Sequence, residues 1–343
     1  GFVEVLGKIP RIRRQLSEIE AWARRERPDV AVLCDYPEFH FRLAARLRAL
    51  GIPTICYIPP KVWVWRKNRL RFLAENYDRV LSILPFEEKV FAGSGVNFRY
   101  VGNPLMDELP LSTSRARARE LLGVAPDVRT LLLMVGSRPS EFQYHLQPMV
   151  EAAYRLRAKF PGAPFRVLAP LPATADLEEF RRRIASVHDG LPAELRAEGE
   201  LDLRISQGDA WLAMRAADAG IVKSVTSSLE AALLDCPHVV VYRGHAVSQF
   251  LFKHIVRYRR AISLTNLIGS EDVAARLVPE LILEDFTVDR MVEEAERLFA
   301  ESAAARQRMG FAKIRNILGS ESPSQRVAEE IFDRAVRSGE GST

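Results

Sequence analysis

One turn of the sequence combines the residue types that bind a phosphate group. The apolar run 131–135 ends at Gly136, Ser137 and Arg138 follow directly, and Glu141 lies inside the next predicted helix. Glycine allows a tight turn, serine caps a helix, and the planar guanidinium of arginine matches phosphate oxygens. Taken alone, the same turn is also an ordinary strand-to-helix junction. The pattern indicates an anion-binding turn if a second element supports it.

A second turn of the same kind gives that support. The strand predicted at 219–222 leads into a segment rich in hydroxyl side chains, with Ser224 and Thr226, and reaches Glu230 one helical turn later. Hydroxyls at a helix N-terminus bind phosphate or sugar oxygens, and Glu230 can accept hydrogen bonds from ribose hydroxyls. The alternative is a capping run followed by a surface glutamate. Together the two turns favour a nucleotide-phosphate pocket in the second half of the chain.

Asp35 is the residue best placed for catalysis in the first half. It follows the apolar run 29–34 and precedes Glu38 and His40. A carboxylate at the end of a strand can act as general base toward a hydroxyl nucleophile, with Glu38 and His40 as neighbours that tune or orient it. A helix-capping role for Asp35 explains the same segment. The histidines have no partners at metal-ligand spacing, so the sequence does not support a metal site.

Two segments mix aromatic and basic side chains. One contains Trp63, Trp65 and Arg66, and the other covers residues 250–260. Such mixtures suit the headgroup layer of an anionic membrane, although a core-facing helix with a basic solvated face would look similar. Nucleic-acid binding is disfavoured because no binding motif is present and the net charge is only +5. With no apolar run of bilayer length and no signal peptide, we expect a cytoplasmic protein at a membrane surface.

Short apolar strands that alternate with helices must position these residues. At 343 residues with 48% hydrophobic content, the chain is long enough for two cores. Continuous apolar runs predict buried parallel sheets, so we expect an α/β protein with two doubly wound domains and a ligand cleft between them. Strands are expected at 29–34, 53–58, 79–84, 98–101, 130–135, 165–168, 201–205, 219–222 and 238–242.

The irregular, proline-containing segment 103–113 marks the expected domain junction. We place a first domain at 1–106 and a second at 107–318. The last helical segment, 319–343, is expected to pack back on the first domain.

With these segments in order, the chain resembles the lipid-A-disaccharide synthases over nearly its whole length. The resemblance implies two facing Rossmann-like domains of the GT-B type and an inverting glycosyltransferase. The implied reaction moves diacylglucosamine from UDP-2,3-diacylglucosamine to 2,3-diacylglucosamine 1-phosphate, forms the β-1,6-linked disaccharide of lipid A, and needs no metal or other cofactor. The matching stretches include Asp35-Tyr36-Pro37-Glu38-Phe39, Val62-Trp63-Val64-Trp65-Arg66, Val101-Gly102-Asn103-Pro104-Leu105, Gly136-Ser137-Arg138, Thr226 to Glu230, Leu264-Thr265-Asn266-Leu267 and Val278-Pro279-Glu280-Leu281.

The resemblance also implies roles for single residues. Asp35 matches the acidic position of the family and is the candidate general base. The implied partners are the two acylated sugars and the cytoplasmic face of the inner membrane, with a homodimer left open. The implied donor-binding residues are Gly136, Ser137, Arg138, Glu141, Ser224, Thr226, Glu230, Asn266 and Glu280. The implied acceptor or membrane residues are Trp63, Trp65, Arg66 and Asn103.

The sequence departs from the family in several places, and two of them bear most directly on the binding site. The family's first strand and its glycine-rich turn have no counterpart, so we expect an N-terminally incomplete first domain. Lys223-Ser224-Val225-Thr226 stands where the family has Ala-Ser-Gly-Thr, which puts a β-branched residue at the phosphate turn and adds a cation. The alternative function is therefore a non-catalytic or substrate-shifted paralogue that binds a UDP-sugar or lipid. Another UDP-sugar transferase or epimerase would share Glu230 but not the Asp35 and Trp63-Trp65 segments.

Overall fold

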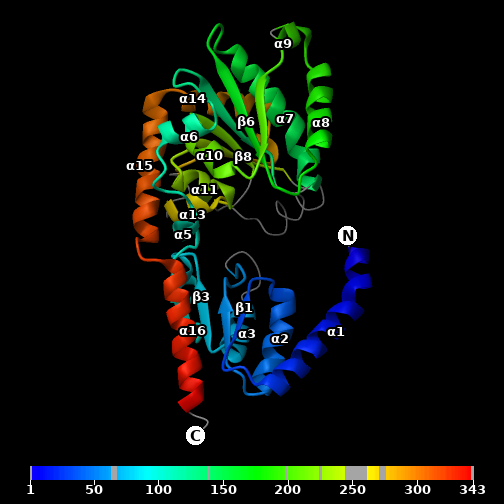
Figure 1. Cartoon of the computed structure of the whole chain (residues 1–343), viewed down its shortest axis with the longest axis vertical. Coiled ribbons are helices and arrows are strands. Elements are labelled where there is room, and N and C mark those ends of the chain that lie inside the picture. The colour runs from blue at the N-terminus through cyan, green and yellow to red at the C-terminus, as the bar shows by residue number, and fades with distance from the viewer. Residues whose placement is uncertain are drawn as a thin grey trace. The chain divides into compact units, whose positions relative to one another are not determined.

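The chain folds into two compact units, each built on one parallel sheet (Figure 1). The computed structural model describes residues 2–62, 68–136, 139–197, 199–223, 226–243, 261–269 and 276–340. The first unit is Gly1–Asp107 with Leu318–Thr343, and the second is Glu108–Ile317. The predicted fold class, α/β with parallel sheets in both halves, is confirmed.

The first unit contains a four-stranded sheet in the order β1-β2-β3-β4. Parallel neighbours need crossover connections, and helices supply them here. The strands are β1 (Ala31–Cys34), β2 (Thr54–Tyr57), β3 (Arg79–Ser82) and β4 (Phe98–Tyr100). The helices are α1 (Phe2–Glu26), α2 (Pro37–Ala49), α3 (Asn68–Asn76), α4 (Glu87–Phe91), α5 (Leu105–Glu108) and α16 (Pro323–Glu340).

Helices cover both faces of this first sheet because successive strand residues point to opposite sides. Cys56 belongs to the apolar cluster formed with α1, α2 and α3, whereas its neighbour Ile55 packs with Val327 of α16. Polar contacts fix the same helix, since Arg334 Nη2 donates to Asp78 Oδ1 at 2.6 Å. The last helix of the chain is thus part of the first unit.

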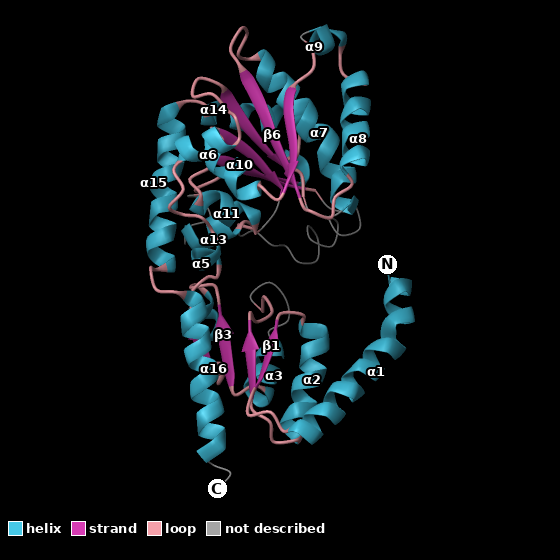
Figure 2. Ribbon diagram, viewed as in Figure 1, coloured by secondary structure: helices cyan, strands magenta, loops and turns pink. Residues whose placement is uncertain are grey.

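The second unit contains a six-stranded sheet in the order β10-β9-β8-β5-β6-β7. Its strands are magenta in Figure 2, where β6 is labelled. The strands are β5 (Arg129–Met134), β6 (Phe165–Leu171), β7 (Asp202–Gln207), β8 (Ala219–Lys223), β9 (His238–Tyr242) and β10 (Glu280–Ile282). Helices α7 (Pro139–Ala158), α8 (Leu177–Asp189) and α14 (Val288–Leu298) pack together on one face. The remaining elements are α6 (Arg115–Leu121), α9 (Ala193–Ala197), α10 (Ala210–Ala216), α11 (Ser227–Leu233), α13 (Leu264–Gly269), η2 (Leu283–Asp285) and α15 (Glu301–Leu318).

The strand order of this second sheet reverses between β5 and β8. From β5 the chain moves outward through β6 to β7, then returns to add β8 on the other side of β5 and continues to β9 and β10. Loops that leave the carboxyl ends of β5 and β8 therefore run apart, which opens a space for a ligand. Among the described residues, no helix is long and apolar enough to cross a bilayer.

His238, at the start of β9, makes the stability of the second unit sensitive to acid. It is fully buried, its ring stacks on Phe311, and burial lowers its pKa to about 4. In the unfolded chain the His238 ring takes up a proton as the pH falls below 6.5, whereas in the folded chain it does so only near pH 4. Acid therefore favours the unfolded state. We expect the free energy of unfolding to fall by about 3 kcal/mol over this window, measured by urea denaturation. A His238→Gln variant should lose this part of the pH dependence; equal pH profiles would contradict the prediction.

Candidate functional site

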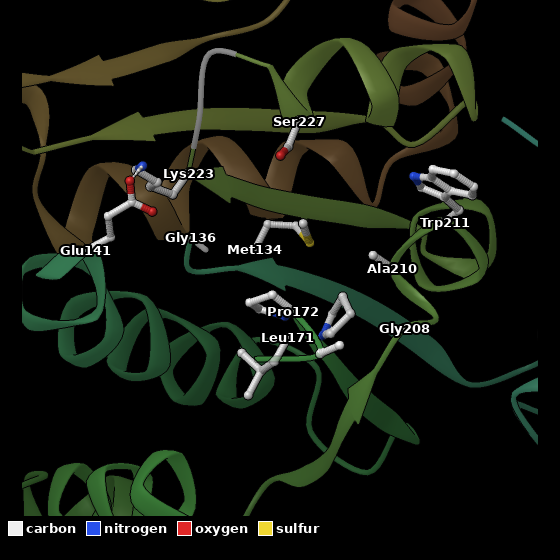
Figure 3. A pocket seen from close by; sticks show the side chains of 12 residues that line it. Met134, Gly136, Glu141, Leu171, Pro172, Gly208, Ala210, Trp211, Lys223 and Ser227 are labelled. Atoms are coloured by element: carbon white, nitrogen blue, oxygen red, sulfur yellow. Dashed lines mark ion pairs between the residues drawn. The ribbon is translucent and has the colours of Figure 1, made fainter. Parts of the chain in front are cut away.

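A cavity of about 290 Å³ opens where the second sheet reverses its strand order (Figure 3). Gly136 follows β5 and Lys223 ends β8, the two strands that flank the reversal. The ends of β6 and β7 and the starts of α10 and α11 complete the wall. The lining residues are Met134, Gly136, Glu141, Pro170, Leu171, Pro172, Ala173, Gly208, Ala210, Trp211, Lys223 and Ser227. Open parallel sheets bind ligands at this position.

Gly136 shapes one end of the cavity through its backbone. Its φ of 120° lies in a region that residues with a Cβ avoid. A Cβ at this position would lie 2.5 Å from Glu141 Oε2, so the first turn of α7 folds its carboxylate directly over the glycine. The predicted turn therefore places Gly136 and Glu141 together at the cavity wall.

Lys223 and Glu141 form an ion pair at the same end of the cavity (Figure 3). Lys223 Nζ lies 2.5 Å from Glu141 Oε1, and the two side chains are 9% and 18% exposed. The ammonium also lies 5.7 Å from the centre of the Tyr242 ring, within cation–π range. The sequence identified Lys223 as an added cation but did not place it among the binding residues.

Trp211 forms the opposite end and hydrogen-bonds to Glu230, which itself is not among the lining residues. Figure 3 shows the indole of Trp211 at the far side of the cavity from Lys223. Glu230 lies in the first turn of α11, where burial raises its pKa, the hydrogen bond from Trp211 opposes that shift, and the charge of Glu108 adds to it. Thr226 is exposed at the N-cap of α11, and Ser227 lines the cavity. The cavity thus has an ionic end and an indole end, and the indole connects that second end to the Glu230 carboxylate behind it.

Asn266 and Glu280 bind each other below the surface rather than lining the cavity. Asn266 Nδ2 donates to Glu280 Oε1 at 2.9 Å, and its Oδ1 accepts from the backbone N–H of Val278 at 3.0 Å. Glu280 also accepts from the backbone and hydroxyl of Ser263 at 2.9 and 2.7 Å. These bonds join α13 to β10. A direct contact of either residue with a donor stays a prediction.

In the first unit, Asp35 is exposed at the carboxyl end of β1 and has a strained backbone. Asp35 and Tyr36 have φ of 53° and 42°, so two consecutive non-glycine residues are left-handed. His40 Nδ1 lies 2.7 Å from the Asp35 carbonyl oxygen, and the Asp35 N–H donates to Tyr57 at 3.0 Å. Such strain, of about 1–3 kcal/mol per residue, persists where surrounding contacts hold it and is common at functional sites.

The remaining predicted residues are exposed, buried or outside the described part of the chain. Glu38 is exposed and pairs with Arg69 rather than with Asp35. Asn103 is 2% exposed and bridges two turns, since it donates to Ile83 and accepts from the N–H of Leu105. The predicted residues that lie outside the described part of the chain are Trp63, Trp65, Arg66, Ser137, Arg138 and Ser224, together with segment 250–260.

Trp211 and Gly208 are cavity residues that the sequence did not reveal. Both follow β7, which is separated from β8 by the two strands β5 and β6, and neither belongs to a recognised motif. Only their position directly after a predicted strand could have indicated them, because the carboxyl ends of all parallel strands lie at the same edge of the sheet.

Comparisons of the sequence with known proteins agree on one family. A family model described as lipid-A-disaccharide synthetase matches residues 1–336. The lipid-A-disaccharide synthase of Myxococcus xanthus (strain DK1622) is 37% identical over 334 residues, and that of Anaeromyxobacter dehalogenans (strain 2CP-C) is 40% identical over 335 residues. Both alignments cover 97% of this chain and 82% of the relative.

Solved structures resemble the fold at low sequence identity. A UDP-GlcNAc 2-epimerase from Neisseria meningitidis, solved bound to UDP-GlcNAc, superposes with a TM-score of 0.59 at 12% identity. A glycosyltransferase from Rickettsia africae ESF-5 superposes with a TM-score of 0.56 at 10% identity. Each match covers 94% of this chain and 81% of the other chain.

Proposed function

This chain belongs to the lipid-A-disaccharide synthase family, and on that premise we propose that it joins two acylated glucosamines using a UDP-linked donor. The family membership makes it a glycosyltransferase of lipid A disaccharide formation. The donor proposal depends on one observation, the cavity at the strand-order reversal of the second sheet. The epimerase with a similar fold was solved with a UDP-sugar, which supports a nucleotide-sugar donor here.

For the donor, we propose that the nucleoside occupies the end of the cavity near Trp211. The Glu230 carboxylate there can accept hydrogen bonds from the two ribose hydroxyls, as the sequence pattern suggested. Trp211 already donates to that carboxylate and so holds it in place. The predicted contacts of Ser137, Arg138, Ser224 and Thr226 with the donor phosphates belong to the same proposal.

For the acceptor, we propose that Asp35 is the general base. Its carboxylate would remove the proton from the 6-hydroxyl of 2,3-diacylglucosamine 1-phosphate as that oxygen attacks the anomeric carbon of the donor. The C–O bond to the diphosphate breaks with inversion, and UDP leaves with the bonding electrons. The exposed side chain and the strained turn at the end of β1 support this role. Contact with the cytoplasmic face of the inner membrane, a homodimer and independence from metal ions are further parts of the proposal.

The proposal is tested by incubating the protein with UDP-2,3-diacylglucosamine and 2,3-diacylglucosamine 1-phosphate. We expect equal amounts of UDP and disaccharide, detected by mass spectrometry, with and without EDTA. UDP binding without any disaccharide would support the non-catalytic alternative instead, which none of the named relatives favours. If neither UDP nor the donor binds, the whole assignment fails.

Glu230 should make nucleoside binding depend on pH. Because burial raises its pKa, the carboxyl group takes up its proton at a higher pH than an exposed glutamate does. A protonated Glu230 accepts ribose hydrogen bonds poorly, so the Kd for uridine should rise as pH falls through this pKa. Its effect on folding has the opposite sign, since a raised carboxyl pKa favours the folded state at low pH.

Calorimetric titration with uridine across the acidic range measures this effect without ionisation of a phosphate group. Glu230→Gln should bind more weakly and independently of pH. Trp211→Phe removes a hydrogen bond that lowers the Glu230 pKa, so the transition should move to higher pH. A wild-type profile as flat as that of Glu230→Gln would show that Glu230 does not bind ribose.

A further inference from the structure

Lys223 carries the positive charge of the donor cavity. Among the described residues that line the cavity, it is the one cation, and Glu141 is the one carboxylate. The lysine ends β8 and is 8% exposed, so its ammonium is largely removed from bulk water. We propose that Lys223 contacts the diphosphate of the nucleotide donor, and that Glu141 positions its ammonium for that contact. This inference rests on the proposed function, because it presumes a UDP-linked donor.

The two partners of the ion pair come from different elements. The Glu141 carboxylate lies over the Gly136 backbone, on the first turn of the 20-residue helix α7. The Lys223 ammonium lies at the end of a flexible stem, with the Tyr242 ring 5.7 Å away. A small rotation of the lysine stem can move the ammonium toward a phosphate oxygen without loss of the attraction to Glu141. Charges this buried are also less screened by salt than charges on the surface.

Stability alone does not account for this pair. A buried ion pair is often no more stabilising than apolar residues of similar volume, because both charges lose their hydration. The pair also lines a cavity, where water or a ligand reaches it, rather than the centre of the core. A diphosphate supplies a second anionic partner for the ammonium at this place. The geometry of the cavity wall therefore suits a cation that binds a ligand phosphate.

The two ligands UDP and uridine separate a phosphate contact from a general packing role. Both contain the nucleoside, but only UDP carries the diphosphate. We expect Lys223→Met to raise the Kd for UDP by about 10- to 100-fold, the usual range for losing a hydrogen bond between charged groups, and the Kd for uridine by less than about twofold. Lys223→Arg retains the charge and should recover most of the UDP affinity. Isothermal titration calorimetry measures both Kd values for each variant.

Lys223→Met leaves the Glu141 carboxylate without its partner, which could itself disturb the fold. Two further variants therefore separate loss of the phosphate contact from misfolding. The double variant Lys223→Met with Glu141→Gln has no net charge change and should lose UDP affinity as Lys223→Met does. Glu141→Gln alone keeps the charge of Lys223 but removes the carboxylate that positions it, so its Kd for UDP should lie between those of the wild type and Lys223→Met. Lys159→Met is the matched control, because Lys159 is a half-exposed lysine of the same unit that does not line the cavity.

The outcomes distinguish this inference from the proposed function. If the wild type binds UDP and Lys223→Met binds it equally well, or loses UDP and uridine affinity in the same proportion, the phosphate contact is wrong and the proposed function stands. If the wild type does not bind UDP at all, the proposed function fails and this inference fails with it. If Lys223→Met and the double variant Lys223→Met with Glu141→Gln both lose affinity for UDP but not for uridine, the phosphate contact is supported.

Discussion

The Asp35→Asn variant is expected to form the disaccharide about 10²- to 10⁴-fold more slowly than the wild type, with UDP affinity unchanged. The amide cannot take the proton of the attacking hydroxyl, but it preserves the size of the side chain. Asparagine also tolerates the left-handed backbone, since Asp35 has a φ of 53°. The loss should therefore appear in kcat and not in the folding of the turn. Measurements of kcat and of thermal unfolding under the same conditions test both parts.

Asp29→Asn is the matched control for this prediction. Asp29 is an exposed carboxylate two residues before β1, at the end of the strand opposite to Asp35. It should leave kcat within about twofold of the wild type. If Asp35→Asn retains more than about a tenth of the wild-type kcat, Asp35 is not the general base, and another group must accept the proton.

Gly136→Ala is expected to weaken UDP binding by at least about tenfold and to lower the melting temperature. Its φ of 120° is strained for alanine, and the new methyl group would lie 2.5 Å from Glu141 Oε2. The backbone strain alone costs about 1–3 kcal/mol. The displaced carboxylate would also leave Lys223, so the ionic end of the cavity would rearrange. Calorimetry with UDP and thermal unfolding measure the two effects.

Gly162→Ala separates the two causes of this effect. Gly162 is also left-handed, with a φ of 72°, but its added methyl group meets nothing within 4 Å. This variant should lower stability without changing the affinity for UDP. Adding Glu141→Ala to Gly136→Ala should restore part of the lost stability, because it removes the collision. Wild-type UDP affinity and melting temperature in Gly136→Ala would contradict the described turn.

Local patterns were sufficient to predict most of the strands. The apolar run predicted at 79–84 contains β3 (Arg79–Ser82), and the run at 130–135 overlaps β5 (Arg129–Met134). The edge strand β10 was missed because it is three residues long and begins with a charged residue, Glu280. The buried Glu280 carboxylate is stabilised by hydrogen bonds from Ser263 and Asn266, which lie outside the strand. A sequence pattern does not show such compensation.

The candidate site was predictable only in part, because some of its contacts depend on tertiary packing that local sequence patterns do not show. Gly136 and Glu230 follow apolar strands, so their position at the carboxyl edge of a sheet follows from the parallel topology. The contact between Glu141 and Lys223 depends on β8 lying next to β5, which the whole strand order decides. The buried bond between Asn266 and Glu280 likewise depends on tertiary packing. The family that the sequence resembles is confirmed, whereas the roles of single residues stay predictions.

The return of α16 to the first sheet has a consequence for synthesis on the ribosome. Ile55 and Leu81 of that sheet pack against Val327, which is translated only after all of residues 108–317. Until then, one face of the first sheet lacks its apolar cover, while the second unit already has every strand that it needs. The later unit can therefore fold first, although domains are usually completed in the order of translation. Before α16 emerges, Ile55 and Leu81 lack the apolar contact that Val327 gives them in the folded unit.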